Sequence, residues 1–218
     1  FYALERLDPS YRVIYGKGDA VDMPANLDGL CKTFERFEPG SSKQLRIFLR
    51  EAERNYQLGI ENLVYKPGLF IREMLDIAIL KNSLHLFDSL SSYVKKKFKS
   101  KRLVQLLEFP VLFLGARAEE TPALYSLMNY ADMVLGTWYP AGGMYKVIEA
   151  LVSLAASLGV EIEYESPVQT LNVNARKLEG CIVRDTFRPF DYVVASADYH
   201  HVEQQLLPPS HRTYSQKY

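Results

Sequence analysis

The spacing of apolar residues along this chain changes between two periods, one typical of strands and one typical of helices. Residues 1–23 show short alternating runs, and we expect strands at 3–7, 11–15 and 20–23. Asp8-Pro9-Ser10 and Gly16-Lys17-Gly18-Asp19 have the composition of turns, and the second predicts a hairpin. Antiparallel strands with one polar face are therefore expected in this part.

Helical spacing dominates between about residue 24 and residue 135. Asn26 suits a helix N-cap, Ser41-Ser42 suits the cap of a long amphipathic helix, and Thr121-Pro122 has the order of another helix start. Pro110 should kink or restart a helix. We expect helices at 27–37, 41–64, 69–90 (a pair meeting near 81–83), 89–98, 103–114 and 121–130.

The stretch from Trp138 to Leu171 reads as one supersecondary unit. Pro140-Ala141-Gly142-Gly143 predicts a tight turn before a helix from about Met144 to Leu158, and Gly159 predicts its left-handed end. Strands are expected at 160–165, 168–171, 177–183 and 190–195, with a turn at 172–176 and a last helix at 199–207. This order of elements indicates an α+β chain, in which a mixed or antiparallel sheet carries a large, mostly helical insertion.

Composition narrows the function. The chain has 218 residues, 48% of them hydrophobic, and a formal net charge of zero, which argues against a disordered chain and against a basic nucleic-acid binder. Cys31 and Cys181 have no metal-type spacing and are expected to be buried and reduced rather than disulfide-bonded. His200-His201 are adjacent and point apart, so no metal site is expected. No signal peptide and no bilayer-spanning apolar run is present.

Several separated blocks of residues recur together in one known family: the turn Trp138-Tyr-Pro-Ala-Gly-Gly-Met144, the apolar stretch 107–115, Thr121–Tyr125 and the segment 191–198. With these blocks the chain resembles the bacterial phytoene desaturases, FAD-dependent carotenoid desaturases related to the amine oxidases. The resemblance implies an oxidoreductase that uses FAD to introduce double bonds into a long apolar isoprenoid such as phytoene. It also implies a substrate-binding domain at 1–141 and a partial FAD-domain segment at 142–218.

The sequence departs from that family at its two ends, where the N-terminal phosphate-binding motif and the C-terminal flavin segment are both missing. It lacks the dinucleotide fingerprint Gly-x-Gly-x-x-Gly after an early strand, and it starts at Phe1 inside a strand-like pattern. We therefore expect an internal fragment of a longer protein, inactive alone and unable to retain FAD.

The resemblance implies four cofactor-binding residues: Gly142, Gly143, Val168 and Ala195. Glycines allow close approach of a ligand, although a tight turn that packs the helix explains Gly142-Gly143 equally well. Val168 would meet the adenine of FAD through its backbone, and a core valine is the alternative. We name no catalytic residue, because hydride passes to the cofactor. The charged groups in or beside apolar segments are Glu108, Glu119, Glu120, Asp132 and Arg117, for which a surface or ion-paired role is the simpler interpretation.

The segment from Tyr93 to Leu114 predicts a membrane-docking surface, because a basic cluster precedes an apolar run. Lys95, Lys96, Lys97 and Lys99 would contact the membrane surface, and the protein would be cytoplasmic and peripherally membrane-associated. The alternative is a helix C-terminus whose lysines complement its dipole. Two other functions stay open: a non-catalytic isoprenoid- or lipid-binding module, and a related flavin oxidase or isomerase with another apolar or amine substrate.

Overall fold

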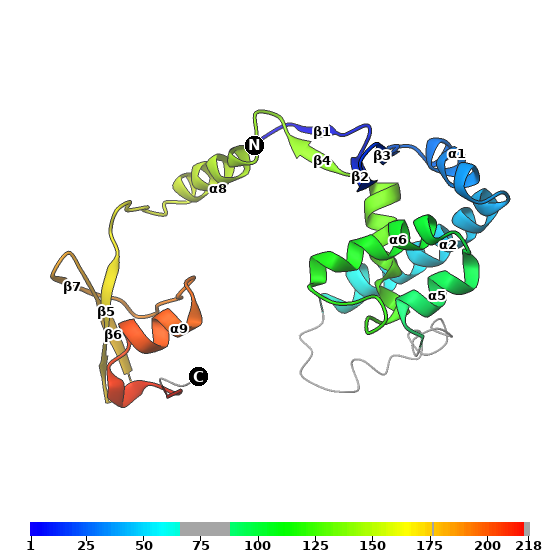
Figure 1. The fold of residues 1–218 in the computed structure, drawn as a ribbon. Helices are drawn as coiled ribbons and strands as arrows, with labels where there is room; N and C mark the ends of the chain where they lie inside the picture. The colour runs from blue at the N-terminus through cyan, green and yellow to red at the C-terminus, as the bar shows by residue number, and fades with distance from the viewer. Residues whose placement is uncertain (66–87, 176, 216–218) are drawn as a thin grey trace. The chain divides into compact units, whose positions relative to one another are not determined.

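The computed structural model describes residues 1–65, 88–175 and 177–215 (Figure 1). The chain divides into two compact units, Phe1–Ala150 and Leu151–Tyr218, with the boundary inside helix α8 (Tyr145–Ser157). Helices and small antiparallel sheets occur together, which confirms the predicted α+β class.

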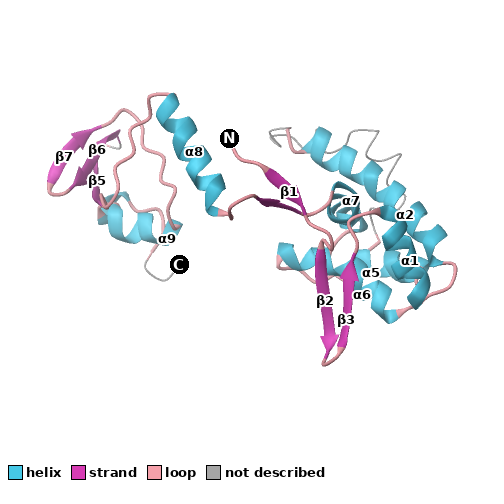
Figure 2. Ribbon diagram, turned by 90° about the horizontal axis from the view of Figure 1, so that it is seen from above, coloured by secondary structure: helices cyan, strands magenta, loops and turns pink. Residues whose placement is uncertain are grey.

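Two short antiparallel pairs supply the strands of the first unit (Figure 2). β2 (Tyr11–Gly16) and β3 (Asp19–Met23) form the predicted hairpin. β1 (Leu4–Arg6) pairs instead with β4 (Trp138–Pro140), and Leu4 stands opposite Pro140. This second pair closes the first unit by joining strands that are far apart in the sequence.

The helices of the first unit begin with α1, which carries the predicted N-cap: the Asn26 side chain accepts a hydrogen bond from the Gly29 N–H. The predicted Ser41-Ser42 cap is wrong, since Gly40 occupies that position in a left-handed conformation and the Ser42 hydroxyl donates to Glu35. The bounds are α1 Leu27–Phe37, α2 Ser41–Tyr56, η1 Gln57–Leu63, α5 Leu90–Lys97, α6 Lys101–Glu108, η2 Phe109–Leu114, η3 Ala123–Ser126, α7 Leu127–Tyr130 and η4 Ala131–Leu135.

The predicted restart of the helix at Pro110 is confirmed. Helix α6 ends at Glu108, and the 3₁₀ helix η2, with Pro110 in its first turn, begins at Phe109. Thr121 does not cap the next helix. Pro122 takes the cap position, and the Thr121 hydroxyl donates to the Arg117 carbonyl. The helix pair predicted at 69–90 falls almost wholly outside the described residues.

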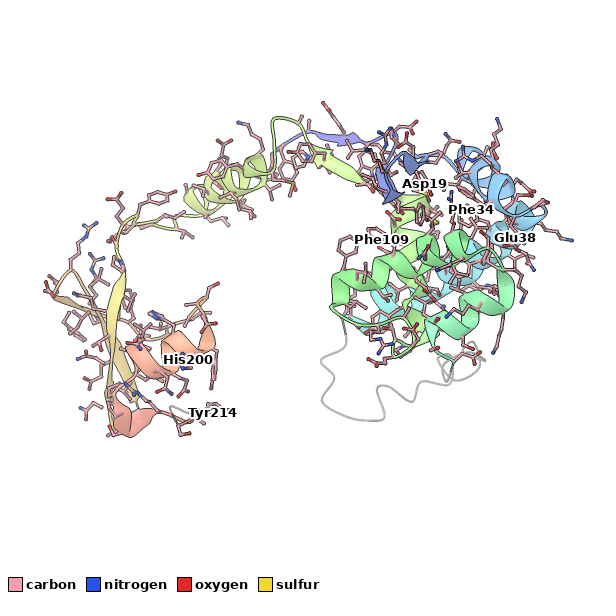
Figure 3. All side chains as sticks on the ribbon, viewed as in Figure 1. Asp19, Phe34, Glu38, Phe109, His200 and Tyr214 are labelled. Carbon is pink, nitrogen blue, oxygen red and sulfur yellow. The ribbon has the colours of Figure 1, made fainter. Side chains whose placement is uncertain are left out.

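Aromatic side chains hold the first unit together. Phe98 lies edge-on to both Phe34 and Phe48, with ring centroids 5.9 and 6.1 Å apart, and all three rings are buried. Such edge-to-face pairs add about 0.5–1.5 kcal/mol each beyond the burial of their area. Figure 3 labels Phe34 on α1, beside Glu38. Glu38 accepts hydrogen bonds from the backbone N–H groups of Lys99 and Ser100, which ties α1 to the start of α6.

The second unit is a three-stranded antiparallel meander with short helices. Leu171, Cys181, Val183 and Leu206 form its small buried core. The turn predicted at 172–176 comes too early, since the first strand continues to Asn174. The bounds are β5 Val168–Asn174, β6 Lys177–Val183, β7 Thr186–Pro189, α9 Tyr199–His201, η5 Val202–Leu206 and η6 Pro209–His211.

The strands predicted at 160–165 and 190–195 are wrong, because neither segment belongs to a strand. A strand requires a neighbour for its backbone N–H and C=O groups. Within the described part of this unit, β5, β6 and β7 pair only with one another. The alternating pattern of Val160, Ile162 and Tyr164 thus leaves apolar side chains exposed.

Helix α8 matches its prediction, and Gly159 beyond it is left-handed with φ +81°. Most of its apolar side chains are exposed, including Ile148, Leu151 and Leu158, and Ala150 is its one buried residue. Both cysteines are buried and reduced, as predicted. In the described ranges, no helix joins the length and the apolar character that a membrane crossing needs.

Candidate functional site

Val168 lines a hollow of about 360 Å³ in the second unit. Cys181 and Val183 form its apolar floor with Val168, and the exposed rings of Phe190 and Tyr192 stand along it. An ion pair between Arg188 and Glu163 lies in the same hollow and lowers the pKa of the Glu163 carboxyl, chiefly through the hydrogen bond from Arg188. Apolar and aromatic walls suit a flat, uncharged ring, whereas the carboxylates Glu161 and Glu163 oppose a phosphate.

Ala195 lines a second hollow of about 570 Å³ in the same unit. Val193 borders both hollows, so the extended segment that contains Val193 and Ala195 runs along the two of them. Arg212 stands in this second hollow and is held in place: Nε donates to the Leu207 carbonyl at 3.1 Å and Nη1 donates to Gln204 Oε1 at 3.3 Å. The remaining lining is mostly apolar, formed by Leu171, Val173, Leu178, Val202 and Leu207, with Ser210 and His211 beside Arg212.

Gly142 and Gly143 form a tight turn before α8, both with positive φ, +88° and +103°. The Gly143 N–H donates to the Pro140 carbonyl at 2.9 Å, so the turn closes on itself. A Cβ on Gly143 would meet only the Tyr139 hydroxyl oxygen, at 3.9 Å, which leaves room for a ligand to approach. These two glycines belong to the first compact unit, whereas Val168 and Ala195 belong to the second.

Asp132 is a half-buried acid beside two hydroxyl groups. Burial raises the pKa of its carboxyl, and hydrogen bonds from the Tyr11 and Thr137 hydroxyls oppose the rise. Tyr11 itself packs on Phe109, with ring centroids 5.5 Å apart. The sequence analysis singled out Asp132 but missed the role of Tyr11, which the alternating pattern placed only in the strand expected at 11–15.

The other candidate charges lie in ion pairs. Arg117 is exposed and lies within 3.9 Å of Glu119 and 3.7 Å of Glu120. The Lys95 Nζ lies 3.9 Å from Glu108 Oε1, a distance too long for a hydrogen bond, and that buried oxygen has no hydrogen-bond partner among the described residues. In the described part of the chain, no cluster of His, Cys, Asp and Glu side chains is suited to a metal ion.

The basic cluster is largely paired with acids. Lys96 Nζ lies 2.8 Å from Asp88 Oδ2, and Lys97 Nζ lies 2.7 Å from Glu51 Oε2. The Lys99 Nζ donates to the Lys95 carbonyl. Just beyond α6, η2 presents three consecutive apolar residues to solvent: Leu112, Phe113 and Leu114 are 66%, 75% and 45% exposed. Apolar exposure, rather than free positive charge, is therefore the stronger feature of the predicted docking surface.

The family of this protein follows from a match that covers almost the whole chain. The model of the family described as flavin-containing amine oxidoreductases matches residues 3–217. The chain belongs to this family. FAD is accordingly the cofactor of the full-length flavin oxidoreductase, and two relatives support the desaturase resemblance.

A carotenoid 3,4-desaturase from Haloarcula japonica is 35% identical over 225 residues, which cover 100% of this chain and 45% of that protein. A zeta-carotene-forming phytoene desaturase from Myxococcus xanthus is 28% identical over 224 residues, 100% of this chain and 43% of that protein. The chain thus spans less than half the length of these curated relatives.

A crystal structure of an oxidoreductase from Methanosarcina mazei aligns with 56% of this chain and 31% of that chain, at 22% identity. The TM-score of 0.36 is low.

The residues of the second unit fit one end of FAD better than the other. The hollow beside Val168 offers an apolar floor and aromatic walls to the adenine ring. The diphosphate needs oriented N–H groups, commonly from a glycine-rich turn at a helix N-terminus. No such fingerprint occurs in this sequence, and the Gly143 N–H is already committed to its own turn. The lining of the hollow beside Val168 therefore suits a flat, uncharged ring, whereas the sequence contains no glycine-rich fingerprint for a diphosphate.

Proposed function

We propose that the full-length protein is an FAD-dependent desaturase acting on a long apolar isoprenoid, of the phytoene or carotenoid class. The observation that carries this proposal is the match over the whole chain to a carotenoid 3,4-desaturase at 35% identity, within a flavin oxidoreductase family. In such a reaction two neighbouring carbons each lose a hydrogen and a C=C bond forms between them. Bound FAD supplies the acceptor for the two electrons.

Residues 1–141 would form the substrate-binding part. An apolar polyene offers no group for hydrogen bonding, so the protein positions it by shape and by apolar contact. The exposed apolar residues of η2 and the aromatic residues around Phe109 support this role, since they present a surface that water solvates poorly. Residues 142–218 would form part of the FAD domain, with Gly142 and Gly143 at its start and Val168 and Ala195 along its two hollows.

Peripheral membrane association is part of the proposal. A substrate of this class dissolves in bilayers, and the tip of η2 offers Leu112, Phe113 and Leu114 for insertion. Lys95, Lys96, Lys97 and Lys99 would contact the lipid headgroups around the inserted residues.

Liposome flotation separates the two contributions. We expect that changing Leu112 and Phe113 to Ser weakens binding strongly, and that changing Lys95, Lys96 and Lys99 to Gln weakens it less. Lys97 is left intact, because its side chain is only 18% exposed and pairs with Glu51, whereas the Lys96 side chain is 58% exposed. Equal binding by the wild type and by both variants would contradict membrane docking at this surface.

Product analysis of the full-length protein tests the activity. The protein, loaded with FAD, is incubated with phytoene and with partly desaturated carotenoids, and the products are separated by chromatography. The proposal predicts products with longer conjugation and absorbance at longer wavelength. Unchanged carotenoids, together with oxidation of an amine, would instead favour a flavin oxidase of the same family.

Flavin retention tests the assignment of Ala195. Ala195 borders its hollow, whereas Val194 beside it is 93% exposed and does not line the hollow. In the full-length protein, Ala195→Leu should reduce the flavin content, and Val194→Leu should leave it unchanged. Equal flavin content in both variants would place the cofactor elsewhere.

A further inference from the structure

A polar hollow of about 510 Å³ lies at the start of α5, apart from the two hollows of the second unit. Its lining differs from theirs, because hydroxyls and ammonium groups replace the apolar side chains. The lining consists of Ser89, Ser91, Ser92, Lys95, Lys96 and Lys99, with Glu119 also present. Neither the family match nor the proposed desaturation accounts for this combination.

Ser91 is the most informative of these residues. It is 2% exposed, and its Oγ has no hydrogen-bond partner among the described residues. A buried hydroxyl without a partner is unfavourable, and native structures usually satisfy such a group with a side chain, an ordered water or a ligand. The backbone N–H of Ser91 does have a partner, because it donates to the Ala118 carbonyl at 3.0 Å. Only the side-chain hydroxyl of Ser91 therefore lacks one among the described residues.

The charges around the hollow leave one ammonium without a counter-charge. Lys96 pairs with Asp88 at 2.8 Å, and Lys95 lies 3.9 Å from Glu108. Among the described residues, the Lys99 Nζ contacts no carboxylate and donates to the Lys95 carbonyl at 3.2 Å. Glu119 Oε2 lies 3.9 Å from Arg117 Nε, so the Glu119 carboxylate has a cation of its own. An anion in the hollow could therefore pair with the Lys99 ammonium group directly. It would compete with Glu108 for Lys95 and with Asp88 for Lys96.

The helix N-terminus does not supply the donors. The N–H of Leu90 donates to the Thr121 carbonyl, and the N–H of Ser92 donates to the Ser89 Oγ. Any ligand here would be held by side chains: three hydroxyl groups that can donate and three ammonium groups. A phosphate group matches this set, because its oxygens accept several hydrogen bonds and carry more than one negative charge.

We propose that the hollow at the start of α5 binds a phosphate group. The Ser91 hydroxyl and the Lys99 ammonium contribute most, and Lys95 and Lys96 form the rest of the cationic wall. Two sources carry this chemistry, a phosphate in solution and the headgroup of a phospholipid. The chemistry of the site is the same for both.

The test uses the full-length protein with inorganic phosphate and pyrophosphate as probes, and follows both binding heat and the shift of Tm. Ser91→Ala and Lys99→Gln should each weaken binding about tenfold or more, as expected for losing a hydrogen bond to a charged group. Lys101→Gln, at a residue that does not line the hollow, is the matched control and should leave binding unchanged. Binding should also weaken as the salt concentration rises.

Ser91→Ala has a second, distinguishing readout. Without phosphate its Tm should equal or exceed that of the wild type, because an unsatisfied hydroxyl is removed. With phosphate it should show little of the Tm increase seen for the wild type. Vesicles of phosphatidylcholine with and without phosphatidic acid then identify the source: binding that requires phosphatidic acid and is lost in Lys99→Gln indicates a headgroup, and binding of free phosphate alone indicates a soluble ligand. Identical behaviour of the wild type, Ser91→Ala and Lys99→Gln toward both probes and both vesicles would overturn the proposal.

Discussion

The Tyr11 hydroxyl donates a 2.7 Å hydrogen bond to Oδ2 of Asp132, across a separation of 121 residues. The bond joins the first hairpin to η4, near the far end of the first unit. Tyr11→Phe should therefore lower the free energy of unfolding by about 1.5–3 kcal/mol, the cost expected when one hydrogen bond to a carboxylate is lost. Tyr139→Phe is the control, because no hydrogen bond of the Tyr139 hydroxyl joins it to the described residues. Denaturant unfolding that gives equal stability for the two variants would contradict this account.

The same pair predicts a pH dependence. Burial raises the pKa of Asp132 in the folded state above its value in the unfolded state. At a pH above both values, the buried charge lowers stability. As the pH falls through the raised pKa, the folded state binds a proton first and stability rises, until the carboxyl is protonated in both states.

Asp132→Asn has no carboxyl group at this position, so this protonation does not contribute to its stability. The stability of the wild type minus that of Asp132→Asn should therefore increase as the pH falls from neutral toward the ordinary pKa of a carboxyl group. The other carboxylates are common to both proteins and cancel in the difference. Denaturant unfolding at a series of pH values measures it. A difference that decreases over this range would show that the charged form is favoured in the fold.

Gly180 lies where β6 meets β7, and a Cβ there would stand 2.1 Å from the Arg188 carbonyl oxygen. Gly180→Ala must push the two strands apart, and we expect it to destabilise the second unit by about 1–3 kcal/mol, as overpacking does elsewhere. Gly16→Ala is the control, because its Cβ would meet nothing within 4 Å. Hydrogen exchange at the β6–β7 amides should accelerate in the first variant alone.

Local elements of the fold were predictable because their determinants are close together in the sequence. The helical stripe of α1 and its Asn26 cap lie within one run of residues. The hairpin of β2 and β3 follows from its own turn. Pairing between distant segments could not be predicted in this way: nothing near Leu4 indicates that it will stand opposite Pro140.

Errors arose where a local pattern lacked a spatial partner. The alternation at 160–165 is real, but an alternating segment becomes a strand only beside another strand. For the lysines, the sequence shows a cluster of positive charge but not the carboxylates that pair with it, since Lys97 pairs with Glu51 in a different helix. Likewise, the positions of Val168 and Ala195 along two neighbouring hollows depend on how the chain returns after β7.

Purified alone, this chain should fold but should not retain FAD. The hollow beside Val168 suits a flat, uncharged ring such as adenine, and the fingerprint for the diphosphate is absent from the sequence. Each missing hydrogen bond to a charged oxygen removes about 1.5–3 kcal/mol, whereas micromolar affinity requires about 8 kcal/mol in total. A cooperative thermal transition without flavin absorbance is the expected result. A yellow protein with one flavin per chain would show that these residues bind the cofactor by themselves.

Anaerobic mixing of the flavin-loaded, full-length protein with its substrate tests the central claim most directly. Absorbance records the oxidised flavin and the conjugation of the isoprenoid at the same time. The account predicts that phytoene or a partly desaturated carotenoid bleaches the flavin while a product of longer conjugation appears in equal amount, and that amines have no effect. A flavin that amines bleach and that these carotenoids leave oxidised would contradict it.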